Sequence, residues 1–303
     1  MNKNKVRIGG ASAFYGDSQL SARQLVKKGE IDYLVFDYLA EVTMAILSQA
    51  KAKNEKLGYA VDFITVAMKD VLQDCAQKGI KVVANAGGVN VPACIESLNA
   101  LCAQLNLNLN IVGVYGDNLL NEVHRETLAE ANTHDLDNGN ELPNTLASMN
   151  AYLGAQPIAD ALAAGADIVI TGRVVDSALV LGPLMHEFSW SYDDYNALAQ
   201  GSLAGHLLEC GAQCTGGNFT DWEQVPDFSD MSYPIAEVKP SGEFTIVIPP
   251  NTGGLVTTFT VAEQLLYEIG DPANYLLPDV CCDFTLVSLE QMHSNAVRVH
   301  GAK

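Results

Sequence analysis

The stretch Lys81-Val82-Val83-Ala84-Asn85-Ala86-Gly87-Gly88-Val89-Asn90-Val91-Pro92 decides the fold class. It begins as a short β-branched run, passes through a glycine turn and enters a helical pattern at Pro92, which is the order of elements in a βα unit. Similar short runs recur along the chain beside helix-like stretches. They are Val6 to Gly9, Tyr33 to Asp37, Asn110 to Tyr115 and Ile168 to Thr171.

Helical periodicity lies between these runs and predicts the connections. Alternating strands and helices predict an α/β fold with a mostly parallel, doubly wound sheet and helices on both faces. Right-handed connections place the loops that follow the strands at one edge of the sheet, where open sheets of this kind bind ligands. The helical stretches are Ser18 to Lys28, Ala40 to Lys53, Asp62 to Lys78, Pro92 to Leu105 and Pro157 to Ala164.

The second part of the chain alternates less regularly. We expect a core over residues 1–190 and a mixed α/β C-terminal extension of the same domain over residues 191–303. Because the last residues end inside a strand pattern, we expect the chain to be truncated. Residues 122–150, with several acidic and amide side chains, predict a long excursion or lid. The later elements are helices over Asp193 to Gly211 and Thr257 to Ile269, and strands over Phe244 to Ile248, Asp283 to Leu289 and Ala296 to His300.

Composition restricts the partners and the compartment. Hydrophobic residues make up 48% of the chain and charged residues 17%, which is typical of a folded protein. A formal charge of −19 disfavours nucleic acid and anionic membranes, so a small molecule is the expected partner. Seven cysteines without a pairing framework favour reduced thiols in the cytoplasm. No signal peptide or membrane span is visible, and base rates for cytosolic enzymes favour a homo-oligomer.

Glycine-rich loops follow two of the predicted strands. In the loop from Gly9 to Ser18, backbone N–H groups could hold a phosphate or carboxylate, with Gly10 and Ser12 in contact with it. This loop matches neither the dinucleotide fingerprint nor the P-loop. The turn at Gly87 and Gly88, flanked by Asn85 and Asn90, offers a second such cradle. Purely structural turns explain the same residues, so both interpretations stay open.

Arg173 is the first candidate for binding an anion. The chain has only 17 Lys and Arg residues, and this one directly follows an apolar strand in Ile170-Thr171-Gly172-Arg173. A guanidinium can hold a carboxylate or phosphate through two hydrogen bonds. The alternative is a structural ion pair with Asp176. If Arg173 does bind an anion, Asp176 would orient it or act as a base.

Other loop carboxylates are candidates for general acid–base catalysis. Asp17, Glu41 and Asp117 follow predicted strands, and a pocket that buries two acids moves their pKa values apart. Helix capping is the competing explanation for Asp17, and a helix-dipole interaction is the competing one for Glu41.

The string His206-Leu207-Leu208-Glu209-Cys210 places an imidazole, a carboxylate and a thiol on one helical face. We expect Glu209 to act as an acid or base beside the loop Thr215-Gly216-Gly217-Asn218. A metal site on the triplet and a nucleophilic Cys210 are alternatives, although buried structural thiols are commoner, and no metal is predicted. A last glycine turn at Thr252-Gly253-Gly254 precedes a helix and suits an anion such as a coenzyme A phosphate.

Four longer strings are distinctive. They are Ile8-Gly9-Gly10-Ala11-Ser12-Ala13-Phe14-Tyr15-Gly16-Asp17, Asp32-Tyr33-Leu34-Val35-Phe36-Asp37-Tyr38-Leu39-Ala40-Glu41, the segment from Gly205 to Phe219, and Glu263-Gln264-Leu265-Leu266-Tyr267-Glu268-Ile269-Gly270-Asp271-Pro272. These strings resemble the acyclic terpene utilisation (AtuA-like) family, and the resemblance spans essentially the whole chain. It implies a role in bacterial breakdown of branched or terpenoid acids as coenzyme A thioesters, next to acyl-CoA carboxylases, and it implies no established reaction.

The anion cradles and acids, together with this resemblance, favour an enzyme acting on a branched acyl-CoA or related carboxylate by hydratase- or lyase-type proton chemistry. The coenzyme A thioester would be a ligand, and no bound cofactor is expected. The alternative is a noncatalytic subunit that binds an acyl-CoA or assembles with an acyl-CoA carboxylase. A thiol or metal enzyme built on His206, Glu209 and Cys210 is a third hypothesis.

Overall fold

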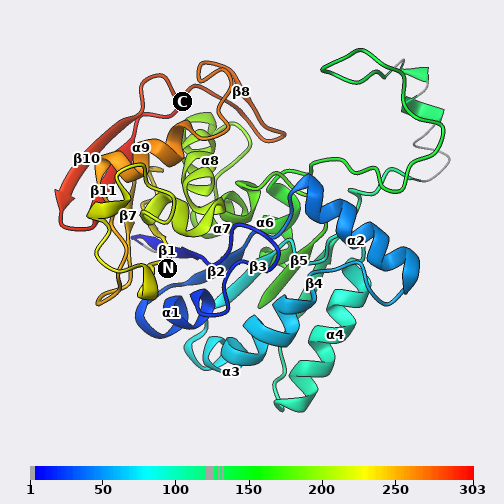
Figure 1. The fold of residues 1–303 in the computed structure, drawn as a ribbon, viewed down its shortest axis with the longest axis horizontal. Helices are drawn as coiled ribbons and strands as arrows, with labels where there is room; N and C mark the ends of the chain where they lie inside the picture. Colours follow the sequence, from blue (N-terminus) through cyan, green and yellow to red (C-terminus); the bar gives the residue numbers. More distant parts are fainter. Residues whose placement is uncertain (1–3, 121–125, 129, 132) are drawn as a thin grey trace.

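A nine-stranded sheet forms the centre of the computed structural model, which describes residues 4–120, 126–128, 130–131 and 133–303. The strand order is β10-β11-β7-β6-β1-β2-β3-β5-β4. In Figure 1 the sheet runs from β10 and β11 at the left to β5 and β4 at the right. The five neighbouring strands β1, β2, β3, β5 and β4 pair in parallel, which confirms the predicted parallel sheet for this part. These strands are β1 (Val6–Gly10), β2 (Tyr33–Phe36), β3 (Lys81–Ala84), β4 (Ile111–Val114) and β5 (Ile168–Thr171).

The remaining strands extend the same sheet beyond β1 in antiparallel orientation, so the sheet as a whole is mixed. Residue 190 lies between two helices, and residues on both sides of it contribute to the sheet. A separate hairpin pairs β8 (Tyr275–Leu276) with β9 (Cys281–Cys282). The antiparallel strands are β6 (Ile235–Val238), β7 (Phe244–Val247), β10 (Ser288–His293) and β11 (Ala296–His300).

Side chains alternate between two hydrophobic clusters along the parallel strands. Tyr33 and Val35 of β2 belong to one cluster, whereas Leu34 and Phe36 belong to the other. This period of two is the geometry of a pleated strand, and burial on both faces requires a continuous apolar run. The sheet therefore lies between two cores.

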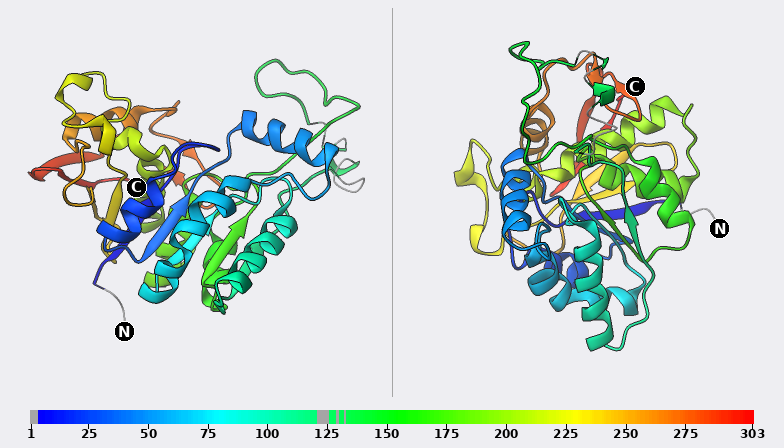
Figure 2. Two further views of the ribbon diagram at one scale, coloured as in Figure 1. Left: turned by 60° about the horizontal axis from the view of Figure 1, so that its bottom comes forward. Right: turned by 90° about the vertical axis from the view of Figure 1, so that its right-hand side faces the viewer.

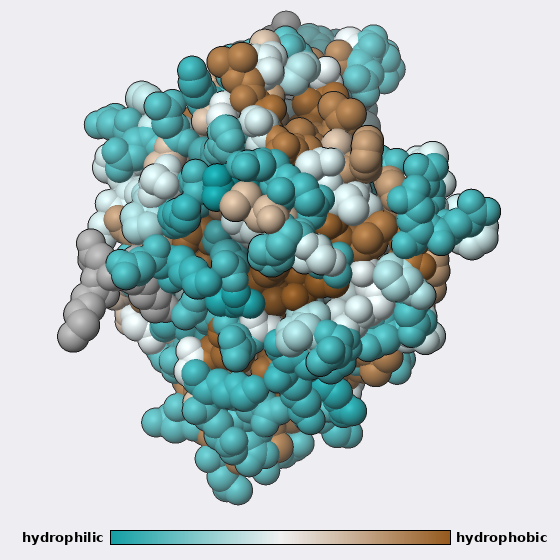
Figure 3. Space-filling view, turned by 90° about the vertical axis from the view of Figure 1, so that its left-hand side faces the viewer, coloured by the Kyte–Doolittle hydropathy of each residue, from teal (hydrophilic) through white to brown (hydrophobic). Residues whose placement is uncertain are grey.

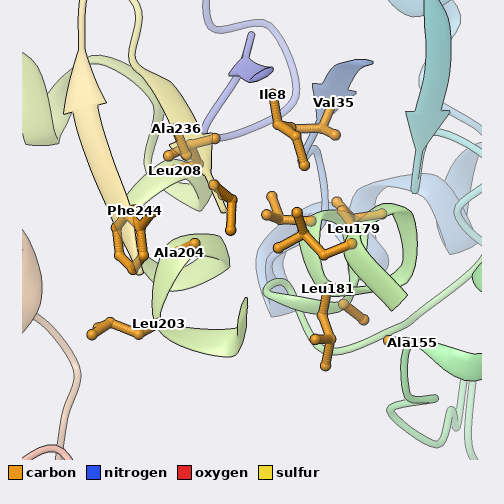
Figure 4. Packing of buried hydrophobic residues seen from close by; sticks show 14 of the residues in the cluster. Ile8, Val35, Ala155, Leu179, Leu181, Leu203, Ala204, Leu208, Ala236 and Phe244 are labelled. Carbon is orange, nitrogen blue, oxygen red and sulfur yellow. The ribbon is translucent and has the colours of Figure 1, made fainter. Parts of the chain in front are cut away.

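Helices from different parts of the chain supply the two clusters. α1 (Ser21–Lys28), α2 (Glu41–Lys53), α3 (Lys69–Lys78) and α4 (Val91–Gln104) contribute to the cluster around Leu34. α6 (Gln156–Ala163), α7 (Ala178–Phe188), α8 (Tyr195–Glu209) and α9 (Thr258–Leu266) contribute to the cluster around Tyr33. In Figure 4, side chains of α7 and α8 lie among those of β1, β2, β6 and β7. After the edge strand β4, the chain returns to β5, which lies between β3 and β4. Helix α6 connects β4 to β5 and belongs to the cluster around Tyr33.

Several elements differ from the sequence-based expectation. The strands β6, β8 and β9 lie where none was predicted. Helix α7 was not predicted because it is buried over most of its surface, and a helix of that kind has no amphipathic pattern. The strand predicted over Asp283 to Leu289 is wrong for most of its length. The Asp283 carboxylate accepts hydrogen bonds from the backbone N–H and hydroxyl of Thr285, which stabilises a turn, and β10 begins only at Ser288.

Residues 133–150 of the expected lid project away from the sheet in Figure 2. Residues 122–125, 129 and 132 of that prediction lie outside the described residues. The base of the projection contacts α2, where the Ser48 hydroxyl donates to the Ala147 carbonyl at 2.9 Å. Asn118 and Asn150 form an antiparallel bridge beside it. The lid is thus tied to the loop after β4.

The surface on the side of the antiparallel strands is mostly hydrophilic, with hydrophobic residues gathered in patches (Figure 3). Within the described part of the chain, no helix is both long enough and apolar enough to cross a membrane. Large hydrophobic side chains exposed in the second half of the chain include Phe259, Leu266, Leu276 and Leu286.

Replacing Phe244 by alanine tests the packing of the antiparallel part. Phe244 is fully buried, so Phe244→Ala should lower the free energy of unfolding by about 3 to 5 kcal/mol. The matched control is Phe259→Ala, because Phe259 is 72% exposed and its loss should change stability by less than about 0.5 kcal/mol. Urea denaturation measures both, and equal losses in the two variants would contradict this packing.

Candidate functional site

Arg173 connects several loops at the carboxyl ends of the parallel strands. It follows β5, and its side chain is only 5% exposed. Its Nη1 donates to Asp176 Oδ1 at 2.8 Å and to the carbonyl of Leu39 after β2. Its guanidinium carbon lies 4.2 Å from the centre of the Tyr152 ring, a cation–π contact. The geometry therefore favours the ion pair with Asp176 that the sequence left as an alternative to anion binding.

Asp117 holds the backbone of Arg173 in place. Its Oδ2 accepts a hydrogen bond from the Arg173 backbone N–H at 2.9 Å and another from the Asn150 amide at 2.8 Å. A side chain at position 172 would begin 2.5 Å from the same oxygen, so only glycine fits between them. Asp117 thus joins the loops after β4 and β5 to the base of the lid.

Glu41 and Tyr152 close this cluster on the side of α2. The Tyr152 hydroxyl donates to Glu41 Oε1, and Glu41 Oε1 lies 3.8 Å from Arg173 Nη2. The Tyr152 hydrogen bond and the Arg173 charge lower the pKa of Glu41, so this carboxylate is ionised at neutral pH. Glu41 therefore acts here as a partner of Tyr152 and Arg173.

A second buried carboxyl group, Asp37, lies behind the cluster. Asn85 donates to its Oδ1 at 2.6 Å, and the Ser12 hydroxyl donates to its backbone carbonyl at 2.8 Å. Burial and the neighbouring Asp176 raise the pKa of Asp37 well above its usual range, although the Asn85 hydrogen bond and the Arg173 charge act in the opposite direction. Asn85 thus orients the Asp37 carboxyl group, while Ser12 fixes the backbone of the same residue.

A cavity of about 380 Å³ opens beside Asp176 and Glu209. The carboxyl groups of Asp176 and Glu209 and the hydroxyl-bearing rings of Tyr152 and Tyr275 form its polar part. The β8–β9 hairpin and the loop joining its strands supply apolar lining. The remaining lining residues are Val175, Ser177, Leu276, Leu277 and Pro278.

Asp176 has the protonation behaviour of a general acid or base. Burial raises its pKa, Arg173 lowers it, and the charges of Glu209 and Glu41 raise it again, to a final value of about 7. A group with a pKa near the operating pH both gives and takes protons readily. Its position in the cavity places that proton within reach of a bound molecule.

Glu209 is the other acid of the cavity, and it is paired with a buried imidazole. His206 is 1% exposed, and its Nδ1 lies 2.8 Å from Glu209 Oε1. Neighbouring Cys210 is less suited to nucleophilic attack, because burial and the Glu209 charge raise the pKa of its thiol. Among the residues that the structure describes, no group of three His, Cys, Asp or Glu side chains is placed to hold a metal ion.

The glycine turns near β1 and β3 use their N–H groups internally. Gly10 donates to the Pro234 carbonyl, and a side chain there would begin 2.8 Å from the backbone of Leu208. Asp17 accepts from the Ala13 N–H and from Tyr233, so it caps no helix. This loop therefore fits a structural role better than an anion cradle.

The turn after β3 has the same character. Gly87 donates to the Thr171 carbonyl and Gly88 to the Asn85 carbonyl, and Gly88 adopts a φ of 52° that glycine tolerates best. The Asn90 amide donates to the carbonyls of Glu55 and Leu57. The structure favours the structural turn that the sequence left open.

The two later glycine turns lie together, apart from the lining of the Asp176 cavity. The Gly254 N–H donates to the Ser232 hydroxyl, which also bonds the Thr252 hydroxyl at 2.6 Å. The Leu255 N–H donates to the Thr215 carbonyl, linking the two turns. The N–H groups of Gly216, Gly217 and Gly253 donate to backbone carbonyls, and Asn218 is exposed.

A second cavity of about 360 Å³ lies between α2 and the base of the lid. Its lining includes Ser48, Lys51 and Asn150 but no carboxylate, and the Lys51 amine already donates to the Val89 carbonyl. Among the described residues that line it, no carboxylic acid is available for proton transfer.

The structure thus gathers seven of the residues singled out in the sequence around one cavity and the cluster behind it, and adds four that sequence reasoning missed. The first group is Ser12, Glu41, Asn85, Asp117, Arg173, Asp176 and Glu209, and the second is Asp37, Tyr152, Asn150 and Tyr275.

Replacing Glu209 tests the coupling of the two cavity acids. The Glu209 charge raises the pKa of Asp176, so Glu209→Gln should make Asp176 titrate at a pH below about 7. Carboxyl ¹³C NMR of aspartate-labelled protein follows that titration directly. Glu290→Gln, on the exposed edge strand β10, is the control and should leave it unchanged. If Asp176 titrated in Glu209→Gln at the same pH as in the parent protein, or at a higher pH, this would contradict the coupling.

Replacing Arg173 tests its role as the connection between loops. Arg173→Met removes a guanidinium that is only 5% exposed and leaves Asp176 without its partner, so it should lower the free energy of unfolding by about 3 kcal/mol or more. Arg23→Met is the matched control, because the Arg23 side chain is 53% exposed and its ion pair with Asp70 should contribute no more than about 1 kcal/mol. Similar losses in both variants, measured by urea denaturation, would rule out this role.

Comparison with known proteins identifies the family. Searches of curated proteins and of solved structures found no match. The model of the acyclic terpene utilisation family protein AtuA matches residues 6–303, which is nearly the whole chain and includes every residue of the cavity. The chain therefore belongs to the acyclic terpene utilisation family AtuA.

Proposed function

We propose that this protein is an enzyme of acyclic terpene catabolism that acts on the acyl end of a branched acyl-CoA, or on a related carboxylate, by hydratase- or lyase-type proton transfer. The observation that carries the proposal is the pairing of Asp176 and Glu209 in one cavity, with Asp176 bonded to Arg173. Membership of the AtuA family supports the metabolic context. The reaction itself is inferred from the cavity.

Each residue has a distinct part in this proposal. Asp176 gives or takes the proton, and Arg173 fixes its position from behind. Tyr275 contributes a hydroxyl that can polarise a carbonyl oxygen, since burial and the charges of Glu209 and Asp176 raise the pKa of its phenol and keep it protonated. The hairpin residues Leu276 and Leu277 provide apolar surface for the acyl chain.

The charge of the cavity determines how a thioester would lie. Asp176, Glu209 and the nearby Glu41 make this region acidic, so the phosphates of coenzyme A are disfavoured inside it. We therefore propose that the acyl group enters the cavity while the nucleotide stays outside. The glycine turn at Thr252 would not hold those phosphates, because its N–H groups are already bonded.

Turnover by an Asp176 variant tests the proposal. Thermal-shift screening of branched acyl-CoAs and the free acids first identifies a ligand, since binding to the native state raises the melting temperature. With that ligand, Asp176→Asn should lower kcat by roughly 10² to 10⁴-fold while the hydrogen bond to Arg173 persists. Asp193→Asn, at an exposed position before α8, should retain the activity of the parent protein.

Two results would contradict the proposal. Full turnover by Asp176→Asn would remove Asp176 from the reaction. Binding of thioesters without conversion of any of them would instead support the noncatalytic acyl-CoA-binding or carboxylase-associated subunit.

A further inference from the structure

His206 occupies an unusual place between the ends of two helices. It lies in the last turn of α8, and its Nε2 lies 3.3 Å from the carbonyl oxygen of Leu265 in the last turn of α9. Carbonyl groups in a last helical turn lack partners within the helix and carry the negative end of the helix dipole. Both helices therefore favour a positive charge on this ring.

The other ring nitrogen also faces an acceptor. Nδ1 lies 2.8 Å from Glu209 Oε1, and a carbonyl oxygen such as that of Leu265 can only accept. If Glu209 is ionised, both ring nitrogens must carry a proton, which makes the ring an imidazolium. The backbone at this point is fixed as well, because the Gln264 amide donates to the His206 carbonyl at 2.8 Å.

Glu209 needs this partner. As the last residue of α8, its carboxylate lies at the negative end of the helix dipole, where a negative charge is disfavoured. It also shares the cavity with Asp176. A buried imidazolium 2.8 Å away offsets both effects.

We propose that His206 is a positioning residue that holds Glu209 as a fixed carboxylate facing the cavity, which leaves Asp176 as the group that exchanges the proton. The role in catalysis rests on the proposed function, whereas the charge state of the pair does not. Under this proposal the two acids of the cavity are not interchangeable: His206 holds Glu209 in one orientation, and Asp176, bonded to Arg173, changes its protonation during the reaction.

The surroundings of the ring agree with this assignment. Burial lowers the pKa of His206. The Glu209 carboxylate and the two backbone hydrogen bonds raise this pKa by a larger amount, so that it ends above the ordinary value for histidine. Arg173 is the other nearby cation, and it is bonded to Asp176. The remaining titratable groups around the pair among the described residues carry no positive charge. They include Cys210 on α8, Tyr275 on β8, Asp37 after β2, Asp176 before α7, and Tyr267 and Glu268 after α9.

Nitrogen-15 NMR of the histidine rings tests the charge state in the unmodified protein. We expect both ring nitrogens of His206 to be protonated at pH 7, and His206→Asn identifies the signal by its absence. In Glu209→Gln the ring should lose its second proton at a pH lower by about one to three units, because an opposite charge at this distance is removed. A neutral His206 ring at pH 7 in the unmodified protein would overturn the proposal without any variant.

Kinetics separates positioning from a purely structural role. His206→Asn keeps a donor that can reach Glu209 but loses the charge, so it should lower kcat more than it changes KM. His206→Leu loses both the donor and the charge, and its kcat should be lower still. Unchanged kcat in His206→Asn would exclude the positioning role. If no thioester is converted by the unmodified protein, the proposed function fails, and the NMR result on the imidazolium–carboxylate pair is unaffected.

Discussion

The buried guanidinium of Arg173 is the interaction on which the arrangement of the site depends. Its side chain donates to Asp176 and to the carbonyl of Leu39, and its backbone N–H donates to Asp117. Through these bonds and the contact with Tyr152, it holds together the loops after β2, β4 and β5 and the segment that follows the lid. These loops meet because parallel strands bring their carboxyl ends to one edge of the sheet.

The same arrangement determines the chemistry. Asp37, Asp176, Glu209 and Glu41 are gathered around one guanidinium and one imidazole, so the acids outnumber the cations. Burial and the neighbouring carboxylates raise the pKa of Asp37 above its usual range and that of Asp176 to about 7. A cavity with an acid whose pKa lies near neutral pH is suited to proton transfer. The leucine side chains that the β8–β9 hairpin contributes to its lining suit an aliphatic substrate.

Much of this could be predicted from the sequence, and the limits have physical causes. Short apolar runs located the parallel strands within about one residue, because burial on both faces requires continuous apolar stretches. Arg173, Asp176 and Glu41 were identified because they lie in or next to the loops that follow predicted strands. Tyr275 was not, because it reaches the cavity from a hairpin distant in the sequence. For the glycine turns near Gly10 and Gly87, an anion cradle and a structural turn both stay open in the sequence, because it does not reveal which N–H groups are already bonded within the fold.

The central claim is that the acyl end of a thioester is bound beside Asp176, and a crystal structure with a branched acyl-CoA tests it most directly. We expect an oxygen of the acyl group, or the carbon that exchanges a proton, within about 3 Å of the Asp176 carboxyl group, with the nucleotide outside the cavity. An acyl group bound instead in the cavity lined by Ser48 and Lys51, or a cavity beside Asp176 that stays empty at saturating ligand, would contradict the account.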